Sequence, residues 1–269
     1  MKIGIFDSGI GGLSLLYELA SRLPDAEFTY YADSENSPYG EKTADEVVRL
    51  TEHAVLFLFD RGADAIVLAC NTATAAAANL LRAKYPDRLI FGMEPAVNEA
   101  VRSVREGKIL VTATPLTLGG EKYHALLDKT GAEERTTSLP LPMLVRYAEG
   151  DLFGRALPTP DGAEDYVRER LSTVTESTEN FAAIVLGCTH FIYFTDIFRR
   201  LIPDCPVFNG ISGTASHVIK TLGLAPATPS ERATAIDMMH RTEFYISGKK
   251  ADEGKMKGFQ NCLELLGRI

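Results

Sequence analysis

The chain has 269 residues, 45% of them hydrophobic, which predicts one large globular domain or two of ordinary size rather than a disordered chain. Its 28 basic and 36 acidic residues give a formal net charge of −8, which argues against nucleic acid or an anionic membrane as the main partner. The sequence contains neither an apolar run long enough to span a membrane nor a signal-peptide pattern at its start. We therefore expect a cytoplasmic protein that acts on a small molecule.

The chain contains four cysteines, Cys70, Cys188, Cys205 and Cys262. Cytoplasmic cysteines stay reduced, so a disulfide framework is not expected. No CxxC pair occurs and only five histidines are present, which argues against a zinc site. Cys205 and Cys262 are not directly followed by polar residues, and we predict that both are packing residues.

The first part of the chain alternates short apolar strands with amphipathic helices. Strands are expected at residues 2–6, 27–31 and 65–68, with helices at 13–23 and 45–60. This alternation predicts a parallel sheet with helices on both faces. The strands lead to side chains that can carry chemistry, namely Asp7, Asp33 and Cys70.

The second part repeats this pattern. A strand at 108–111, a helix at 122–129 and a strand at 183–187 are expected before a last helix at about 252–266. The strand–cysteine–polar segment 66–72 is similar to the segment 184–190. The match indicates an internal duplication, although two apolar strands can also look alike by chance.

We therefore predict an α/β protein of two similar parallel-sheet domains, related by pseudo-symmetry, with the active site in the cleft between them. Residues 1–95 together with 208–269 would form the domain that carries Asp7 and Cys70. Residues 96–207 would form the domain that carries Cys188 and His190. Ligands bind beyond the carboxyl ends of strands in such sheets, so both cysteines are expected at the cleft.

Two thiols on opposite faces of one carbon can remove a proton from one side and return one on the other, which is racemisation. Asp7 and His190 are suitable neighbours to assist because a free thiol holds its proton at neutral pH. Other interpretations exist for each residue. Either cysteine alone is more often a core residue, His190 a structural histidine, and Asp7 with Ser8 a helix cap.

The same loops carry groups that can bind a small zwitterion: Ser8, Tyr39, Gly40, Asn71, Thr72 and Thr189. Hydroxyl groups and backbone N–H groups at helix N-termini suit carboxylates. Tyr39 can equally be an ordinary turn residue.

A different function is suggested by the glycine turn after the first strand. Gly9-Ile10-Gly11-Gly12 followed by Asp33 is most of a dinucleotide-binding fingerprint, and it would indicate an NAD-type oxidoreductase. Ser14 stands at the third glycine position, which weakens this interpretation. A non-catalytic two-domain binding protein of periplasmic type is a further alternative, and the missing signal sequence argues against it.

Taken together, five segments resemble the glutamate racemases of the aspartate/glutamate racemase superfamily, namely residues 6–13, 38–40, 70–74, 94–95 and 186–190. The resemblance runs in order from residue 4 to about 190. It implies two α/β domains with the site between them. It also implies deprotonation by one cysteine and reprotonation by the other, without pyridoxal phosphate, another cofactor or a metal.

By this resemblance Cys70 and Cys188 are the two catalytic cysteines, and Asp7 and His190 assist proton transfer. The residues implied in substrate binding are Asp7, Ser8, Pro38, Tyr39, Gly40, Asn71, Thr72, Thr114, Thr117, Thr189 and His190. Asp33 and Glu149 match acidic residues near the site. The resemblance further implies a supply of D-glutamate for peptidoglycan and a homodimer.

The sequence departs from the family pattern in two places. Phe191 and Ile192 stand where Tyr-Pro is usual, and residues 209–212 replace an Asp-Ser-Ala-like stretch. Aspartate-preferring relatives tend to carry glutamate at the position of His190, so His190 favours glutamate as substrate. An aspartate racemase or a related decarboxylase is the remaining alternative in the superfamily, although a decarboxylase needs only one cysteine.

Overall fold

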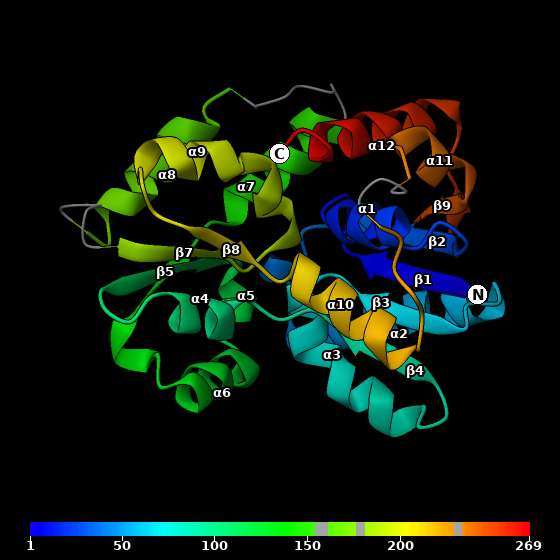
Figure 1. Cartoon of the computed structure of the whole chain (residues 1–269), viewed down its shortest axis with the longest axis horizontal. Coiled ribbons are helices and arrows are strands. Elements are labelled where there is room, and N and C mark those ends of the chain that lie inside the picture. Colours follow the sequence, from blue (N-terminus) through cyan, green and yellow to red (C-terminus); the bar gives the residue numbers. More distant parts are fainter. Residues whose placement is uncertain (154–160, 176–180, 229–232) are drawn as a thin grey trace.

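The computed structural model describes residues 1–153, 161–175, 181–228 and 233–269, and it contains two sheets that lie side by side (Figure 1). The first sheet has the order β10-β9-β2-β1-β3-β4. Its strands are β1 (Lys2–Asp7), β2 (Glu27–Ala32), β3 (Ala65–Leu68), β4 (Leu89–Gly92), β9 (Thr242–Ile246) and β10 (Lys249–Lys250). All neighbours in it pair in parallel except β10, which is antiparallel to β9.

The second sheet is parallel throughout and has the order β6-β5-β7-β8. Its strands are β5 (Lys108–Ala113), β6 (Thr136–Pro140), β7 (Phe181–Leu186) and β8 (Val207–Asn209). This order repeats the β2-β1-β3-β4 part of the first sheet, with β5 in the place of β1 and β7 in the place of β3. The predicted pair of similar parallel α/β units is thereby confirmed.

Helices cover both faces of the first sheet (Figure 1). One face carries α1 (Leu13–Arg22), α10 (Ile211–Thr221), α11 (Ala235–His240) and α12 (Glu253–Leu266), and the other carries α2 (Ala44–Asp60) and α3 (Asn71–Lys84). The alternation along β1 explains this arrangement: Ile5 packs in the same core as α1, and Phe6 packs in the core of α2 and α3. Helix α2 begins with a reciprocal capping box between Thr43 and Glu46.

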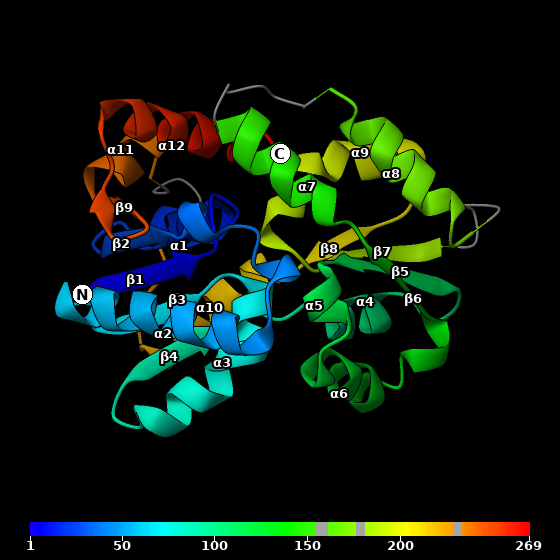
Figure 2. The same cartoon turned by 180° about the vertical axis from the view of Figure 1, so that it is seen from behind.

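The second sheet is covered in the same way (Figure 2). Helices α4 (Val97–Ser103) and α6 (Glu121–Thr130) lie on one face, with α7 (Pro142–Tyr147), α8 (Ala163–Ser172) and α9 (Thr195–Leu201) on the other. A short helix, α5 (Pro115–Leu118), follows β5. The described residues also form the short 3₁₀ segments η1 (Ser34–Asn36), η2 (Tyr39–Glu41), η3 (Glu133–Arg135) and η6 (Thr189–Phe194), and η4 (Ala148–Phe153) is a π-helix.

The predicted helices and strands exist, with small shifts at their ends; β7, for example, begins at Phe181 instead of residue 183. The predicted division between residues 207 and 208 falls inside β8, which belongs to the second sheet. Helix α10 follows at once and packs on α1 of the first sheet. We therefore propose that the chain returns to the first domain after Asn209.

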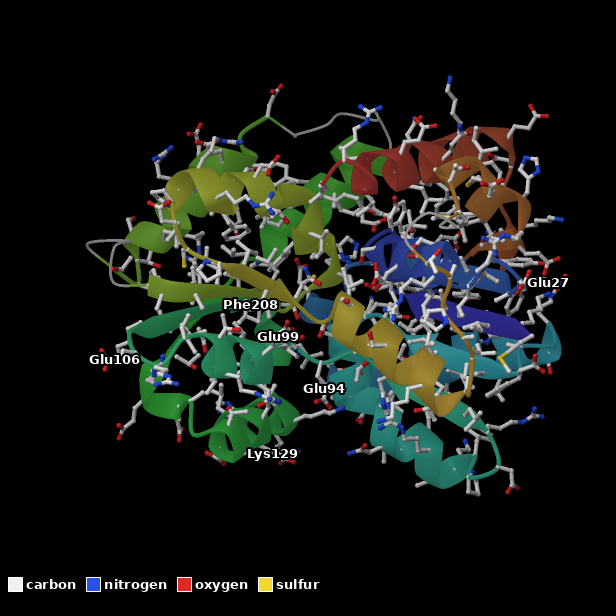
Figure 3. All side chains as sticks on the ribbon, in the orientation of Figure 1. Glu27, Glu94, Glu99, Glu106, Lys129 and Phe208 are labelled. Carbon is white, nitrogen blue, oxygen red and sulfur yellow. The ribbon has the colours of Figure 1, made fainter. Side chains whose placement is uncertain are left out.

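The strands of both sheets begin at the outer ends of the molecule. Figure 3 places Glu27, the first residue of β2, at one end and Glu106, just before β5, at the other, with Glu94 between them. The carboxyl ends of the strands of the two sheets therefore face each other in the middle of the molecule. Ligands bind at the carboxyl ends of strands in sheets of this kind. In the part of the chain that is described, no helix combines the length and the apolar character that crossing a membrane requires.

Candidate active site

Two buried cysteines end equivalent strands of the two sheets. Cys70 follows β3 and caps α3, where its Sγ accepts a hydrogen bond from the Ala73 N–H at 3.5 Å. Cys188 follows β7 and precedes η6. The two residues are 5% and 7% exposed, so neither thiol is open to bulk solvent. Burial, together with the negative charge of Asp7, raises the pKa of the Cys70 thiol to about 12.

Asp7 lies at the end of β1 and is completely buried. Its Oδ1 accepts from the Gly9 N–H at 3.0 Å, and its Oδ2 accepts from the Thr189 hydroxyl at 3.0 Å. Burial raises the pKa of this carboxyl group to about 6, although the positive charge of His190 acts to lower it. Helix α1 has Gly12 at its N-cap and no side-chain capping bond, so the interpretation of Asp7 and Ser8 as a helix cap is wrong.

His190 lies between a thiol and a carboxylate. Its Nδ1 is 3.8 Å from Cys188 Sγ, and its Nε2 is 2.7 Å from Glu149 Oε1. Burial by itself would lower the pKa of the ring, but its bonds to Cys188 and Glu149 raise that pKa well above the usual value. This direction favours the protonated ring, which can donate from both nitrogens.

Glu149, which the family resemblance matched to an acidic residue near the site, lies at the centre of this network. It belongs to η4, which follows α7. Its Oε1 accepts from the Ile10 N–H at 2.6 Å, and its Oε2 accepts from the Ser34 hydroxyl at 3.1 Å. Ser34 was not predicted from the sequence, because a lone serine in a polar loop carries no signal of its own.

The glycine turn after β1 lets the second half of the chain approach closely. A Cβ on Gly9 would lie 1.8 Å from Glu149 Oε1, and a Cβ on Gly11 would lie 2.3 Å from Thr189 Oγ1. A dinucleotide would need the same stretch of backbone for its pyrophosphate. Protein side chains already occupy that place, so the dinucleotide interpretation is not supported.

Two buried tyrosines, which the sequence analysis did not single out, hold the carbonyl groups of this turn. Tyr30 donates to the Gly9 carbonyl at 2.6 Å, and Tyr193 donates to the Ile10 carbonyl at 3.1 Å. Both aromatic rings lie in the hydrophobic core. They fix the two peptide units on either side of Ile10, whose N–H binds the carboxylate of Glu149.

Three threonines join the two sheets beside the thiols. Thr72 on α3 is hydrogen-bonded to Thr114 at 2.9 Å and to Thr117 at 3.0 Å, and the last two are 2.9 Å apart. Thr114 also caps α5 through the Thr117 N–H. Gly40 packs against the same group, since a Cβ on it would lie 2.4 Å from Thr114 Cβ.

Tyr39 and Asp33 form a second buried pair. The Tyr39 hydroxyl donates to Asp33 Oδ2 at 2.6 Å, and both side chains are buried, so Tyr39 is not an ordinary turn residue. Pro38 precedes this tyrosine and is half-buried. Asn71, at the start of α3, has a buried Oδ1 without a hydrogen-bond partner, which leaves an acceptor free at the site.

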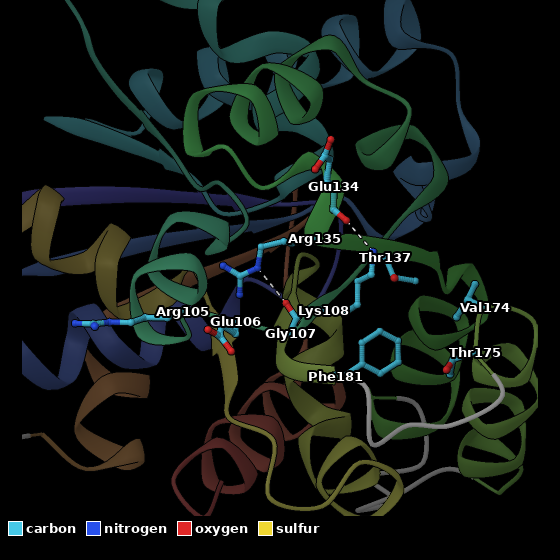
Figure 4. A pocket seen from close by; sticks show the side chains of 10 residues that line it. All are labelled: Arg105, Glu106, Gly107, Lys108, Glu134, Arg135, Thr137, Val174, Thr175 and Phe181. Atoms are coloured by element: carbon cyan, nitrogen blue, oxygen red, sulfur yellow. Dashed lines mark hydrogen bonds between the residues drawn. The ribbon is translucent and has the colours of Figure 1, made fainter.

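A separate hollow lies at the outer end of the second sheet (Figure 4), where Lys108 begins β5 and Phe181 begins β7. Two of its cationic groups bond to backbone: Lys108 Nζ donates to the Glu134 carbonyl at 2.8 Å, and Arg135 Nε donates to the Gly107 carbonyl at 3.0 Å. It faces away from the thiols. Over the described ranges, no three His, Cys, Asp or Glu side chains are grouped so that they could hold a metal ion.

Residues 14–218 match the Asp/Glu/Hydantoin racemase family. A glutamate racemase of Campylobacter curvus is 47% identical, with 100% of this chain and 98% of that protein covered. One from Halothermothrix orenii is 44% identical, with 98% and 99% covered. The solved structure of Escherichia coli glutamate racemase, in complex with L-glutamate and the activator UDP-MurNAc-Ala, has a TM-score of 0.76 and 25% identity over 93% of this chain and 99% of that one. With its fold and full-length similarity, the chain belongs to the Asp/Glu/hydantoin racemase family, among the glutamate racemases.

Proposed function

We propose that the chain interconverts L- and D-glutamate by moving the α-proton between the thiols of Cys70 and Cys188, without an organic cofactor. The observation that carries this proposal is the pair of buried cysteines at equivalent strand ends, each with its own acid–base neighbour. Asp7 and Ser8 lie beside Cys70, and His190 lies beside Cys188. The Escherichia coli relative binds L-glutamate in a chain of similar fold.

In one direction Cys188 is the base. The imidazolium of His190 points a donor at Cys188 Sγ, which is the environment that stabilises a thiolate. This thiolate removes the α-proton from the face of glutamate that it meets. Cys70 holds its own proton because burial raises its pKa to about 12, and it delivers that proton to the opposite face.

In the other direction Cys70 must give up its proton before it can act. Asp7 is suited to accept it, because a carboxyl group whose pKa is about 6 exchanges protons readily near neutral pH. The hydroxyl of Ser8 lies 3.7 Å from Cys70 Sγ and can stabilise the thiolate that results. Cys188, which in this direction first takes a proton from His190, then delivers that proton on its side, and the neutral His190 ring keeps its hydrogen bond to Glu149.

The polar groups around the thiols fit the three charges of glutamate. The free Oδ1 of Asn71 can accept from the ammonium group. Carboxylates suit the N–H groups at the start of α3 and the hydroxyls of Thr72, Thr114 and Thr117. Such contacts hold the α-carbon between the two sulfur atoms, and that position is what racemisation needs.

The test is incubation of the protein with L-glutamate in D₂O without added cofactor, followed by circular dichroism and by the NMR signal of the α-proton. We expect optical activity to vanish while deuterium enters the α-position and no keto acid forms. The variants Cys70→Ala and Cys188→Ala should each abolish racemisation. The matched control is Cys205→Ala, whose buried thiol faces the Phe181 carbonyl at the outer end of β7. Racemisation near the parent rate in either of the first two variants would refute the two-thiol mechanism.

We further propose that this activity supplies D-glutamate for peptidoglycan in the cytoplasm, and that the chain acts as a homodimer. The similarity to the glutamate racemases supports the activity from which the supply role is inferred. Sedimentation analysis of the purified chain tests the dimer. Rescue of a D-glutamate-requiring bacterial strain tests the supply role.

A further inference from the structure

The tight turn between β9 and β10 carries an unusual residue. Ser247 and Gly248 connect the two strands, and both have positive φ angles, of 45° and 85°. Hairpin turns of this kind favour Asn-Gly or Gly-Gly, because a positive φ strains most side chains. A serine held in this conformation therefore needs a compensating interaction.

Ser247 has three such interactions, one with the last residue of β2 and two with the segment that follows it. Its N–H donates to the Ala32 carbonyl at 2.8 Å, and its hydroxyl donates to Asp33 Oδ1 at 2.7 Å. The same hydroxyl accepts from the Glu35 N–H at 3.1 Å. The hairpin thus holds the loop 33–36 in place.

This loop serves both thiols. On the first side, Asp33 accepts the hydrogen bond of Tyr39, which packs in the same buried cluster as Cys70. On the second side, Ser34 donates to Glu149 Oε2, and Glu149 holds His190 beside Cys188. A displacement of the loop would therefore disturb both halves of the site together.

We infer that Ser247 is a positioning residue for the racemase site, acting through Asp33 on Tyr39 and through Ser34 on Glu149. The inference rests on the proposed function and adds to it a residue from the C-terminal hairpin that touches neither thiol. The strain at φ 45° is maintained because the hydroxyl, which glycine lacks, sets the position of the loop.

The substitution that separates these roles is Ser247→Gly, because glycine relieves the backbone strain and removes only the hydroxyl. If the hydroxyl positions the loop, KM for glutamate should rise and kcat/KM should fall roughly tenfold. This loss is smaller than the ~100-fold loss in rate that follows when a catalytic group itself is misplaced by 1 Å. Tm should stay unchanged or rise. Hydrogen exchange in peptides covering residues 33–41 should become faster.

The control is Lys249→Ala. This substitution removes the ion pair between Lys249 and Glu35, which joins the same hairpin to the same loop. The two side chains are 77% and 56% exposed. Kinetics and exchange should match the parent.

Unchanged KM and unchanged exchange in Ser247→Gly would overturn the inference. So would a lower Tm with a lower apparent kcat at constant KM, because a smaller folded fraction gives that result. If the parent protein does not racemise glutamate, the proposed function fails, and loop exchange alone then decides the role of Ser247.

Discussion

Gly11 gives the sharpest test of how closely the two halves of the site must approach. A Cβ added there would lie 2.3 Å from Thr189 Oγ1, 2.7 Å from His190 Nδ1 and 2.8 Å from the His190 backbone nitrogen. Ordinary contacts begin at 3.4 Å, so the neighbours would have to move by roughly 1 Å. Rotation of the Thr189 side chain cannot relieve the contact with backbone, so the whole turn that carries His190 must shift.

Misplacing a catalytic group by 1 Å costs about 100-fold in rate. We therefore expect Gly11→Ala to lower kcat/KM for glutamate by about 100-fold, or about 2.7 kcal/mol of transition-state stabilisation. The assay is the initial rate of change in circular dichroism with each enantiomer. The control is Gly213→Ala on α10, where a Cβ would meet nothing within 4 Å. It should keep the parent rate and gain about 0.5–1 kcal/mol of stability. A folded Gly11→Ala protein within about threefold of the parent rate would refute this reasoning.

Three further predictions concern charge. Burial raises the pKa of Asp7 from 3.8 to about 6, so its ionisation destabilises the fold increasingly as pH rises through that window. In urea denaturation at pH 8, the free energy of unfolding of Asp7→Asn should therefore exceed that of the parent by up to about 3 kcal/mol, and near pH 4 this gain should disappear. The variant should also lose activity. Equal gains in stability at both pH values would contradict the prediction. Glu149→Gln removes a group that raises the pKa of His190, so the alkaline fall of kcat should move to lower pH; a pH–rate profile with an unmoved alkaline limb would count against the pairing. Arg146→Ala breaks an ion pair with Glu41 whose side chains are 52% and 39% exposed, and thermal unfolding should show a loss below about 1 kcal/mol with unchanged kinetics; a loss above about 2 kcal/mol would contradict it.

The sequence predicted the parts of the site that lie next to a strand end. Asp7, Cys70 and Cys188 each end or follow a buried strand, and parallel strands bring such ends to one edge of a sheet. The similarity of the two halves was visible because strand, cysteine and polar follower recur together. The structure adds that the two sheets share one strand order.

The missing parts depend on contacts between distant segments. Ser34 meets Glu149 across 115 positions, and Ser247 meets Asp33 across 214. No periodicity or local motif connects such residues, because their meeting depends on how helices and a hairpin pack around the sheets. Glu149 also lies in a π-helix, which has no dependable sequence signal.

The two thiols occupy equivalent places in the fold and yet have different surroundings. Cys70 caps an α-helix, and its sulfur accepts a hydrogen bond from the Ala73 N–H. Cys188 precedes a 3₁₀ segment and faces the ring of His190. Burial keeps Cys70 in its protonated form in the substrate-free site, and in the proposed mechanism each thiol has a different acid–base neighbour. L- and D-glutamate have equal free energies in water, so kcat/KM must be the same in both directions whatever the site does. The asymmetry can only appear in kcat and KM separately, and a tighter KM for one enantiomer must be matched by a lower kcat for it.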